Sequence, residues 1–221
     1  SLFTLSFCLA LLIALPMGIL AAARVNSNFD YGINLIAFGA ISIPPFWLAL
    51  MTIVFFSVIL AWFPAGGTAA AAGVDDTWAG ARYLVLPVIC LTIASFGSHI
   101  RYMRASMIEI LHQDFIRTAR AKGLSERQIL IGHALRNALI PVVTVVALDF
   151  GSLFSGAMIT ETIFSYPGMG KLIFDAIMGN DFNLALITLL FATALTLLAN
   201  FIADIAYILL DRRMTYLDGS K

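Results

Sequence analysis

The sequence predicts an all-α, polytopic membrane protein, and three observations support this fold class. First, 61% of the 221 residues are hydrophobic and only 12% are charged, whereas soluble domains are about half apolar and a quarter charged. Second, the mean hydropathy of +0.94 is too high for a chain that folds in water. Third, the apolar residues form five runs, each close to or above the ~20 residues that a helix needs to cross a bilayer core. We therefore expect one transmembrane domain over residues 1–221.

The first two apolar runs cover residues 2–23 and 33–61. The second run is longer than one span requires and contains Pro44 and Pro45, so we expect a kink or a broken helix there. Broken backbone at membrane depth is stable only against protein or along a wet cavity. Ser42, Pro44 and Pro45 are therefore candidates for the wall of a translocation path, and a surface kink without a role is the alternative.

The remaining runs cover residues 83–100, 138–160 and 182–210. The middle one of these contains Asp149 and Ser152. A carboxylate within a membrane span is energetically costly and indicates a functional position by default. Both residues are therefore further candidates for the path. The alternative is a role in helix packing, which the small residues around them also favour.

Basic residues are distributed unequally between the two sides that these spans define. One side has 11 of the 13 Lys and Arg residues, and the other has only Arg82 and Lys171. By the positive-inside rule, the basic side and the C-terminus are cytoplasmic. The chain then begins outside and crosses the membrane five times. Because Ser1 lies within an apolar run, we expect a truncated N-terminus, and one more span before Ser1 would give six.

No motif for catalysis, for a metal or for a cofactor is recognisable in the sequence. The segment before Lys171 lacks the first glycine of a P-loop, and the next residue, Leu172, is not the hydroxyl residue that binds magnesium. The three histidines do not have the spacing of metal ligands, and no Ser, His and Asp set is evident. We therefore expect no catalytic residue, no metal site and no cofactor in this chain, which we predict is not an enzyme.

The longest polar stretch is the loop at residues 101–137. Within it, residues 114–122 predict a short helix, and Gly123 fits the left-handed position just after a helix end. Ser125 and Gln128 have the spacing of a capping box, which begins a second helix. This arrangement is compatible with a solvated loop, with a DNA-binding helix-turn-helix and with a docking element for a protein. Because the loop is confined between two spans, we expect no nucleic acid partner.

Two segments of this loop resemble the cytoplasmic EAA loop of ABC importer permeases: RTARAKGLS at 117–125 and HALRNALIP at 133–141. Their form is that of the dipeptide/oligopeptide/nickel permease family, and within it of the first permease subunit. The segments SIPPFW at 42–47 and FSYPGMG at 164–170 match the same family. RTA stands where the general motif has Glu-Ala-Ala, a departure that is usual in this branch. The resemblance covers essentially the whole chain.

The resemblance implies the permease subunit of an ATP-driven importer in a bacterial or archaeal plasma (inner) membrane. Such a subunit forms the translocation path for short peptides or for a related substrate such as nickel. The implied partners are a second homologous permease subunit, two ABC ATPase subunits, which hold ATP and magnesium, and an extracytoplasmic substrate-binding protein. The alternative is an ion-coupled secondary transporter or a channel, for which we would expect an inverted repeat or paired intramembrane charges. No convincing repeat is evident among the spans.

The resemblance also implies that the loop contains the coupling helix, which docks on an ATPase subunit. The residues expected at this contact are Phe115, Ala119, Arg120, Ala121, Lys122, Gly123, Leu124 and Ser125. We expect the apolar face of the helix to dock, and Arg120 and Lys122 to pair with carboxylates of the ATPase. Closure of the ATPase subunits would then rock the spans and alternate access to the path.

Overall fold

The computed structural model describes residues 2–73, 77–152 and 158–210, and every regular element in these ranges is a helix. Four helices are long and apolar enough to cross a membrane. A fifth span results if a bent pair, Asn28–Ser42 with Pro45–Ile59, counts as one. The all-α membrane architecture predicted from the sequence is confirmed.

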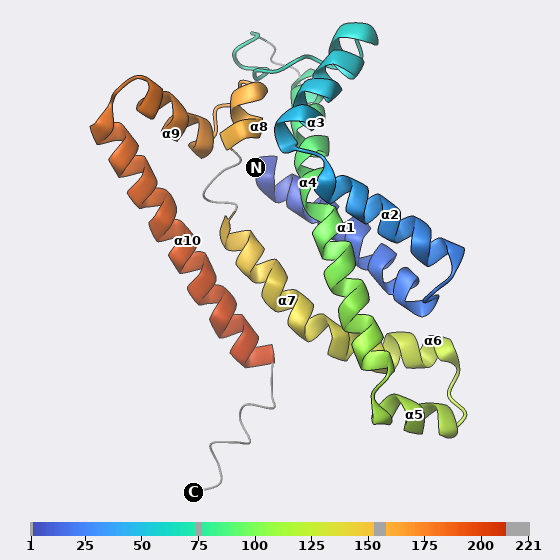
Figure 1. Cartoon of the computed structure of the whole chain (residues 1–221). Helices are drawn as coiled ribbons and strands as arrows, with labels where there is room; N and C mark the ends of the chain where they lie inside the picture. Colours follow the sequence, from blue (N-terminus) through green and yellow to red (C-terminus); the bar gives the residue numbers. More distant parts are fainter. Residues whose placement is uncertain (1, 74–76, 153–157, 211–221) are drawn as a thin grey trace, which may run out of the picture.

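The centre of the molecule is the pair α1 (Leu2–Ala23) and α4 (Thr77–Leu111), which pack against each other (Figure 1). One face of α1 has a small, buried residue at every fourth position: Ser6, Ala10, Ala14, Gly18 and Ala22. Small side chains at this spacing allow two helix backbones to approach closely. A Cβ atom on Gly18 would lie 2.7 Å from the Cβ of Met103 on α4, so the absence of a side chain at Gly18 permits this approach.

The second apolar run is broken at its two prolines, as predicted. α2 (Asn28–Ser42) ends there, and α3 (Pro45–Thr52) begins and continues into the π-helical η1 (Ile53–Ile59). The two halves of the run are bent by 96°. A proline disfavours helical backbone in the residue before it, and Ile43 and Pro44 are accordingly extended, with ψ of 121° and 132°.

α4 is longer than the span predicted at residues 83–100. It continues without a break to Leu111, about three turns further. The polar loop expected at 101–137 therefore begins as an extension of α4. It continues as three short elements before α7 (Leu135–Ser152), namely α5 (Asp114–Ala121), α6 (Glu126–Gln128) and the π-helical η2 (Ile129–Ala134).

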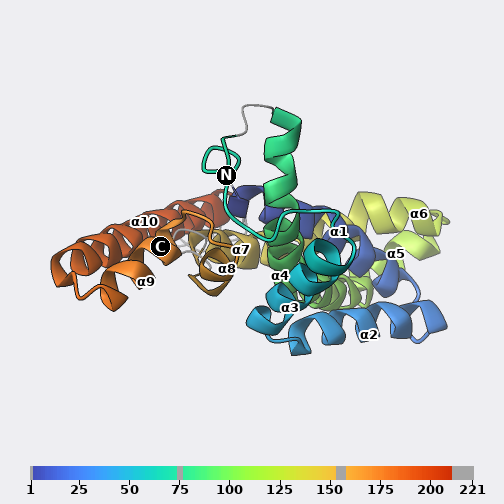
Figure 2. The same ribbon diagram turned by 90° about the horizontal axis from the view of Figure 1, so that it is seen from above.

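The C-terminal part of the described chain consists of α8 (Met158–Ile163), α9 (Met169–Met178) and α10 (Phe182–Leu210). α10 packs against α7 and α9. Seen from above, α9 and α10 lie at one end of an elongated molecule, and α2, α5 and α6 lie at the other (Figure 2). The central helices α1, α4 and α7 connect the two ends.

A buried carboxylate holds the connection between α8 and α9. Glu161 is fully buried, and its Oε2 accepts the backbone N–H of Lys171 at 2.7 Å. A Cβ atom on Gly168 would collide with this carboxylate, which explains the glycine in the segment FSYPGMG. Burial raises the pKa of Glu161, and the backbone N–H groups of Lys171 and Gly170 lower it by less. The folded chain therefore holds this proton to a higher pH than the unfolded chain, so the stability from this group decreases as pH rises through that interval.

Candidate functional site

The helix, turn and second helix predicted in the polar loop are present. α5 ends in a left-handed turn at Gly123, where φ is +80° and the backbone N–H donates to the carbonyl oxygen of Arg120 at 2.9 Å. Ser125 then caps α6. Its hydroxyl accepts the N–H of Gln128 at 3.4 Å, and the side-chain oxygen of Gln128 accepts the N–H of Ser125 at 3.0 Å. The predicted turn glycine and capping box are thus confirmed as local structure.

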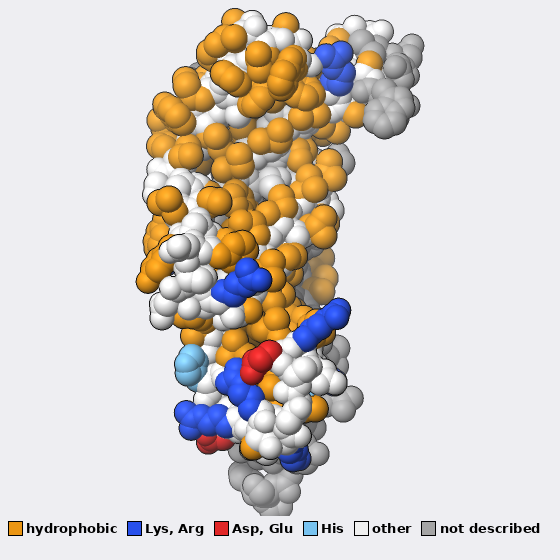
Figure 3. Space-filling view, turned by 90° about the vertical axis from the view of Figure 1, so that its right-hand side faces the viewer, with side chains coloured by type: hydrophobic (Ala, Val, Ile, Leu, Met, Phe, Trp, Pro, Cys, Tyr) orange, Lys and Arg blue, Asp and Glu red, His pale blue; other side chains and the backbone are white. Residues whose placement is uncertain are grey.

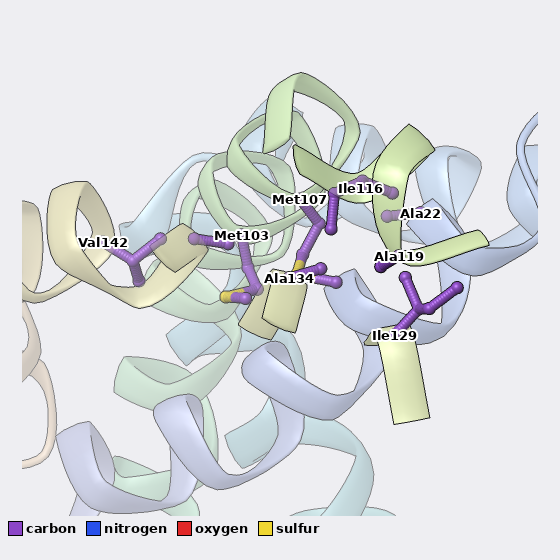
Figure 4. Close-up of a cluster of buried hydrophobic side chains, with 9 residues drawn as sticks. Ala22, Met103, Met107, Ile116, Ala119, Ile129, Ala134 and Val142 are labelled. Carbon is purple, nitrogen blue, oxygen red and sulfur yellow. The ribbon is translucent and has the colours of Figure 1, made fainter. Parts of the chain in front are cut away.

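A buried apolar cluster attaches this turn to the long helices. Its nine members come from five elements, and all are at most 6% exposed. They are Ala22 of α1, Met103 and Met107 of α4, Ile116 and Ala119 of α5, Ile129 and Ala134 of η2, and Ala138 and Val142 of α7. Figure 4 shows eight of these side chains labelled, with those of α5 and η2 pointing toward Met107 and Ala22. We refer to this set as the coupling cluster. The cluster packs α5 and η2 tightly against α1, α4 and α7.

The orientation of α5 corrects part of the expectation from the sequence. Ala119 was expected at the contact with a partner, but it is buried in the coupling cluster together with Ile116. Phe115 is 39% exposed and is the large apolar side chain of α5 that faces outward. Ala121, Lys122, Gly123 and Ser125 are exposed, and Leu124 packs partly against the cluster.

The charge pairing of α5 also differs from the expectation. Arg120 does not present an unpaired guanidinium to a partner, because it forms a bidentate ion pair with Glu126 of α6, with nitrogen–oxygen distances of 2.8 and 3.1 Å. This pair joins α5 to α6 across the turn. Within the described part of the chain, no carboxylate lies within ion-pair distance of Lys122 or Arg127. The outer surface of the turn is therefore basic, and Figure 3 shows Lys and Arg side chains gathered at this end of the molecule below a broad hydrophobic region.

The candidate path residues lie on α2, on α3 and on α7, and each of these helices packs against α4. Ser42, Pro44 and Pro45 are exposed at the break between α2 and α3. Asp149 is on α7, and its side chain is 46% exposed. The structure places these two groups on separate elements. The side chain of Ser152 lies outside the part of the chain that the structure describes.

Asp149 has a partner that the sequence did not reveal. Its Oδ2 lies 3.2 Å from Nε2 of His99 on α4, and the imidazole is almost fully buried, with the ring of Phe7 edge-on against it. Nδ1 of His99 lies 2.7 Å from the carbonyl oxygen of Ser95 and so donates a proton there. The contact with Asp149 is therefore most favourable when the imidazole is protonated on both nitrogens. The signal in the sequence is a histidine and a carboxylate, each within an apolar run.

A second polar contact joins α2 to α4. Asp30 is buried at the start of α2. Its two carboxylate oxygens accept hydrogen bonds from Nε and Nη2 of Arg104, at 2.6 and 2.7 Å. The backbone N–H of Asn26 and the side-chain amide of Asn34 donate to the same carboxylate. A buried ion pair is stable only when its remaining hydrogen-bonding groups are satisfied, and that condition is met for this carboxylate. The two residues are 74 positions apart, so sequence reasoning missed the pair.

Comparisons with known proteins agree on one family. Residues 14–216 match the family model described as "Binding-protein-dependent transport system inner membrane component". The chain is 40% identical over 211 residues to the oligopeptide transport system permease protein AppB of Bacillus subtilis. This alignment covers 96% of this chain and 67% of the relative. It is 39% identical over 213 residues to the oligopeptide permease protein OppB of Haemophilus influenzae, with coverages of 96% and 66%. It thus spans about two thirds of the length of these relatives.

The fold is also similar to a solved structure. A chain of the MetNI methionine ABC transporter in an inward-facing conformation matches with a TM-score of 0.74, covering 96% of this chain and 92% of that one. The sequence identity is 19%, so this likeness supports the arrangement of the helices and nothing more specific.

Proposed function

We infer the function of this chain from a premise that the comparisons establish: it belongs to the family of binding-protein-dependent transport system inner membrane components. We propose that it is the permease subunit of an ATP-driven importer of short peptides, the substrates named for its relatives AppB and OppB. The same proposal includes nickel as the alternative substrate. The observation that supports this role best is the coupling cluster, which connects an exposed, capped turn to three long helices.

In the proposed mechanism, the ATPase subunits bind ATP and magnesium, and this chain converts their closure into helix movement. The outer surface of α5 and the turn after it docks on one ATPase subunit. The coupling cluster then moves the ends of α1, α4 and α7 as one body. The Arg120–Glu126 pair bridges α5 and α6 across the turn, and the capping box holds the start of α6, so both oppose bending of the turn.

Docking uses the exposed residues of the turn rather than the buried face of α5. Phe115 supplies an apolar contact, and Lys122 and Arg127 supply positive charge. The complementary ATPase surface is therefore an apolar pocket with carboxylates beside it. Gly123 and Ser125 contribute backbone at the point of closest approach. Ala119 acts from within, by holding α5 on the coupling cluster.

The proposed orientation puts the basic end of the molecule, including α5 and α6, in the cytoplasm, in accordance with the positive-inside rule. The hydrophobic region above it in Figure 3 then faces the bilayer and a second, homologous permease subunit. An extracytoplasmic substrate-binding protein delivers the peptide on the side of α8 and α9. The membrane is the plasma (inner) membrane of a bacterium or archaeon.

The proposed path includes the break at Ser42, Pro44 and Pro45, together with Asp149 and Ser152. The half-exposed carboxylate of Asp149 offers an acceptor for the ammonium group of a peptide. His99 holds this carboxylate in place from the buried side. An intramembrane carboxylate that both pairs with a buried residue and remains accessible fits a substrate pathway.

A reconstituted complex tests the proposal. The chain is purified with its second permease subunit and ATPases, inserted in proteoliposomes, and supplied with a binding protein and a radiolabelled dipeptide. We expect peptide uptake that requires ATP and magnesium on the ATPase side. Uptake driven by an ion gradient through this chain alone would instead establish the secondary transporter.

A further inference from the structure

We propose that the groove between α2 and α4 is a binding site for one anionic phospholipid of the cytoplasmic leaflet. This site goes beyond the proposed transport function, because neither ATP coupling nor peptide binding requires it. The groove has a volume of about 800 Å³. It runs along α2 from Asp30 to Ile41 and along α4 from Ser98 to Ala105. Its charge, its apolar wall and its depth each indicate the ligand.

The charge of the groove is positive. Three charged residues line it, and two of them, Asp30 and Arg104, neutralise each other in the buried ion pair. The third, Arg101, has no carboxylate within ion-pair distance among the described residues. Its guanidinium lies over the ring of Phe38, 4.5 Å from the ring centre, which holds it at the groove without using its hydrogen-bond donors on an anion. Arg101 is therefore available to a phosphate.

The wall of the groove has both apolar side chains, which suit an acyl chain, and polar side chains, which suit a headgroup. Phe38 and Ile41, on α2, line one end and are about half exposed. Tyr31 and Tyr102 also line the groove and are exposed. Tyrosine is enriched at the level of lipid headgroups, because its ring is apolar and its hydroxyl is polar. The headgroup meets Arg101 where its guanidinium lies over Phe38, and an acyl chain extends from there along Ile41.

The depth of Arg101 agrees with the headgroup level. Arg101 follows Tyr83, the start of the predicted span on the same helix, by 18 residues, which is about 27 Å of α-helix. The hydrocarbon core of a bilayer is about 30 Å thick. Arg101 therefore lies where the core ends on the proposed cytoplasmic side, the side on which basic sites between helices bind anionic headgroups.

Native mass spectrometry of the whole transporter complex tests this site. The complex is placed in nanodiscs of phosphatidylcholine with phosphatidylglycerol, released, and examined for retained lipid. We expect one phosphatidylglycerol retained per copy of this chain in preference to phosphatidylcholine. Arg101→Gln should lower this preference about fivefold, the effect of one basic residue near an anionic headgroup, and Arg101→Lys should keep most of it.

Arg24→Gln is the matched control. Arg24 is exposed, precedes α2 and lies over an aromatic ring, Phe29, at 5.5 Å, but it does not line the groove. Its replacement should leave the retained lipid unchanged. Equal losses in both variants, or no preference for phosphatidylglycerol in the wild type, would overturn the proposal. Release of the second permease subunit by Arg101→Gln would also overturn it and identify the groove as a protein interface. None of these outcomes depends on peptide uptake, so the proposed function is judged separately.

Discussion

Substitutions at Gly123 allow an effect on docking to the ATPase to be distinguished from an effect on folding of this chain. With φ of +80°, any residue with a Cβ costs about 1–2 kcal/mol at this position. A Cβ placed on Gly123 meets no atom within 4 Å, so no steric term is added within the chain. The backbone cost is therefore shared by alanine and tryptophan, and the exposed position of Gly123 leaves room for the larger side chain to project outward. A loss of this size is a fraction of the 5–15 kcal/mol that stabilises an ordinary domain.

The two substitutions differ only in what projects outward. Gly123→Ala should retain most ATP-driven uptake, whereas Gly123→Trp inserts an indole ring between α5 and the proposed ATPase surface. We expect Gly123→Trp to lower uptake at least about tenfold, equivalent to a loss of about 1.4 kcal/mol of docking energy. Gly123→Pro should also uncouple transport, because proline is incompatible with a positive φ and removes the N–H that bonds to Arg120.

The assay compares dipeptide uptake and ATP hydrolysis in proteoliposomes that contain equal amounts of assembled complex. Membrane insertion and expression are measured by quantitative blotting of the membrane fraction. Normal ATP-driven uptake by Gly123→Trp would refute the docking of this turn. Equal losses in Gly123→Ala and Gly123→Trp would mean that backbone conformation, and not contact with a partner, explains the effect.

Three further predictions concern the membrane part of the chain. Gly18→Leu should lower the thermal unfolding midpoint in detergent by several degrees, because it forces α1 from α4, whereas Gly39→Ala, whose Cβ meets nothing within 4 Å, should not lower it. Glu161→Gln should remove the loss of thermal stability that this buried carboxyl causes as pH rises above the ordinary pKa of glutamic acid, since amide side chains do not titrate. Parallel pH profiles of the two proteins would contradict the burial argument. Asp149→Asn should lower peptide uptake while the ATPases remain bound in pull-down experiments, and unchanged uptake would assign Asp149 and His99 to helix packing.

The local features of the coupling turn were predictable because their causes lie within a few residues. A left-handed glycine, a serine cap and its glutamine at the third helical position depend on short backbone hydrogen bonds. The break between α2 and α3 was predictable for the same reason, since each proline restricts the residue before it. The apolar runs identified the long helices because the hydrocarbon core requires a minimum length.

The direction in which α5 faces was not determined by the sequence alone. An apolar stripe must be buried, but a partner protein and the chain's own helices satisfy it equally well. The extension of α4 to Leu111 brings Met107 against Ile116, so the stripe packs internally and the surface left for a partner is Phe115 with the basic turn.

The same distinction explains the contacts that sequence reasoning missed. Asp30 with Arg104, and His99 with Asp149, join residues far apart in the chain, and their pairing depends on the register of one helix against another. That register follows from close packing, as at Gly18, where a single absent side chain lets α1 approach α4. The sequence by itself therefore determined the helices, the turn and the family. Only the tertiary structure decided which faces meet, because that choice depends on the shapes of all the helices together.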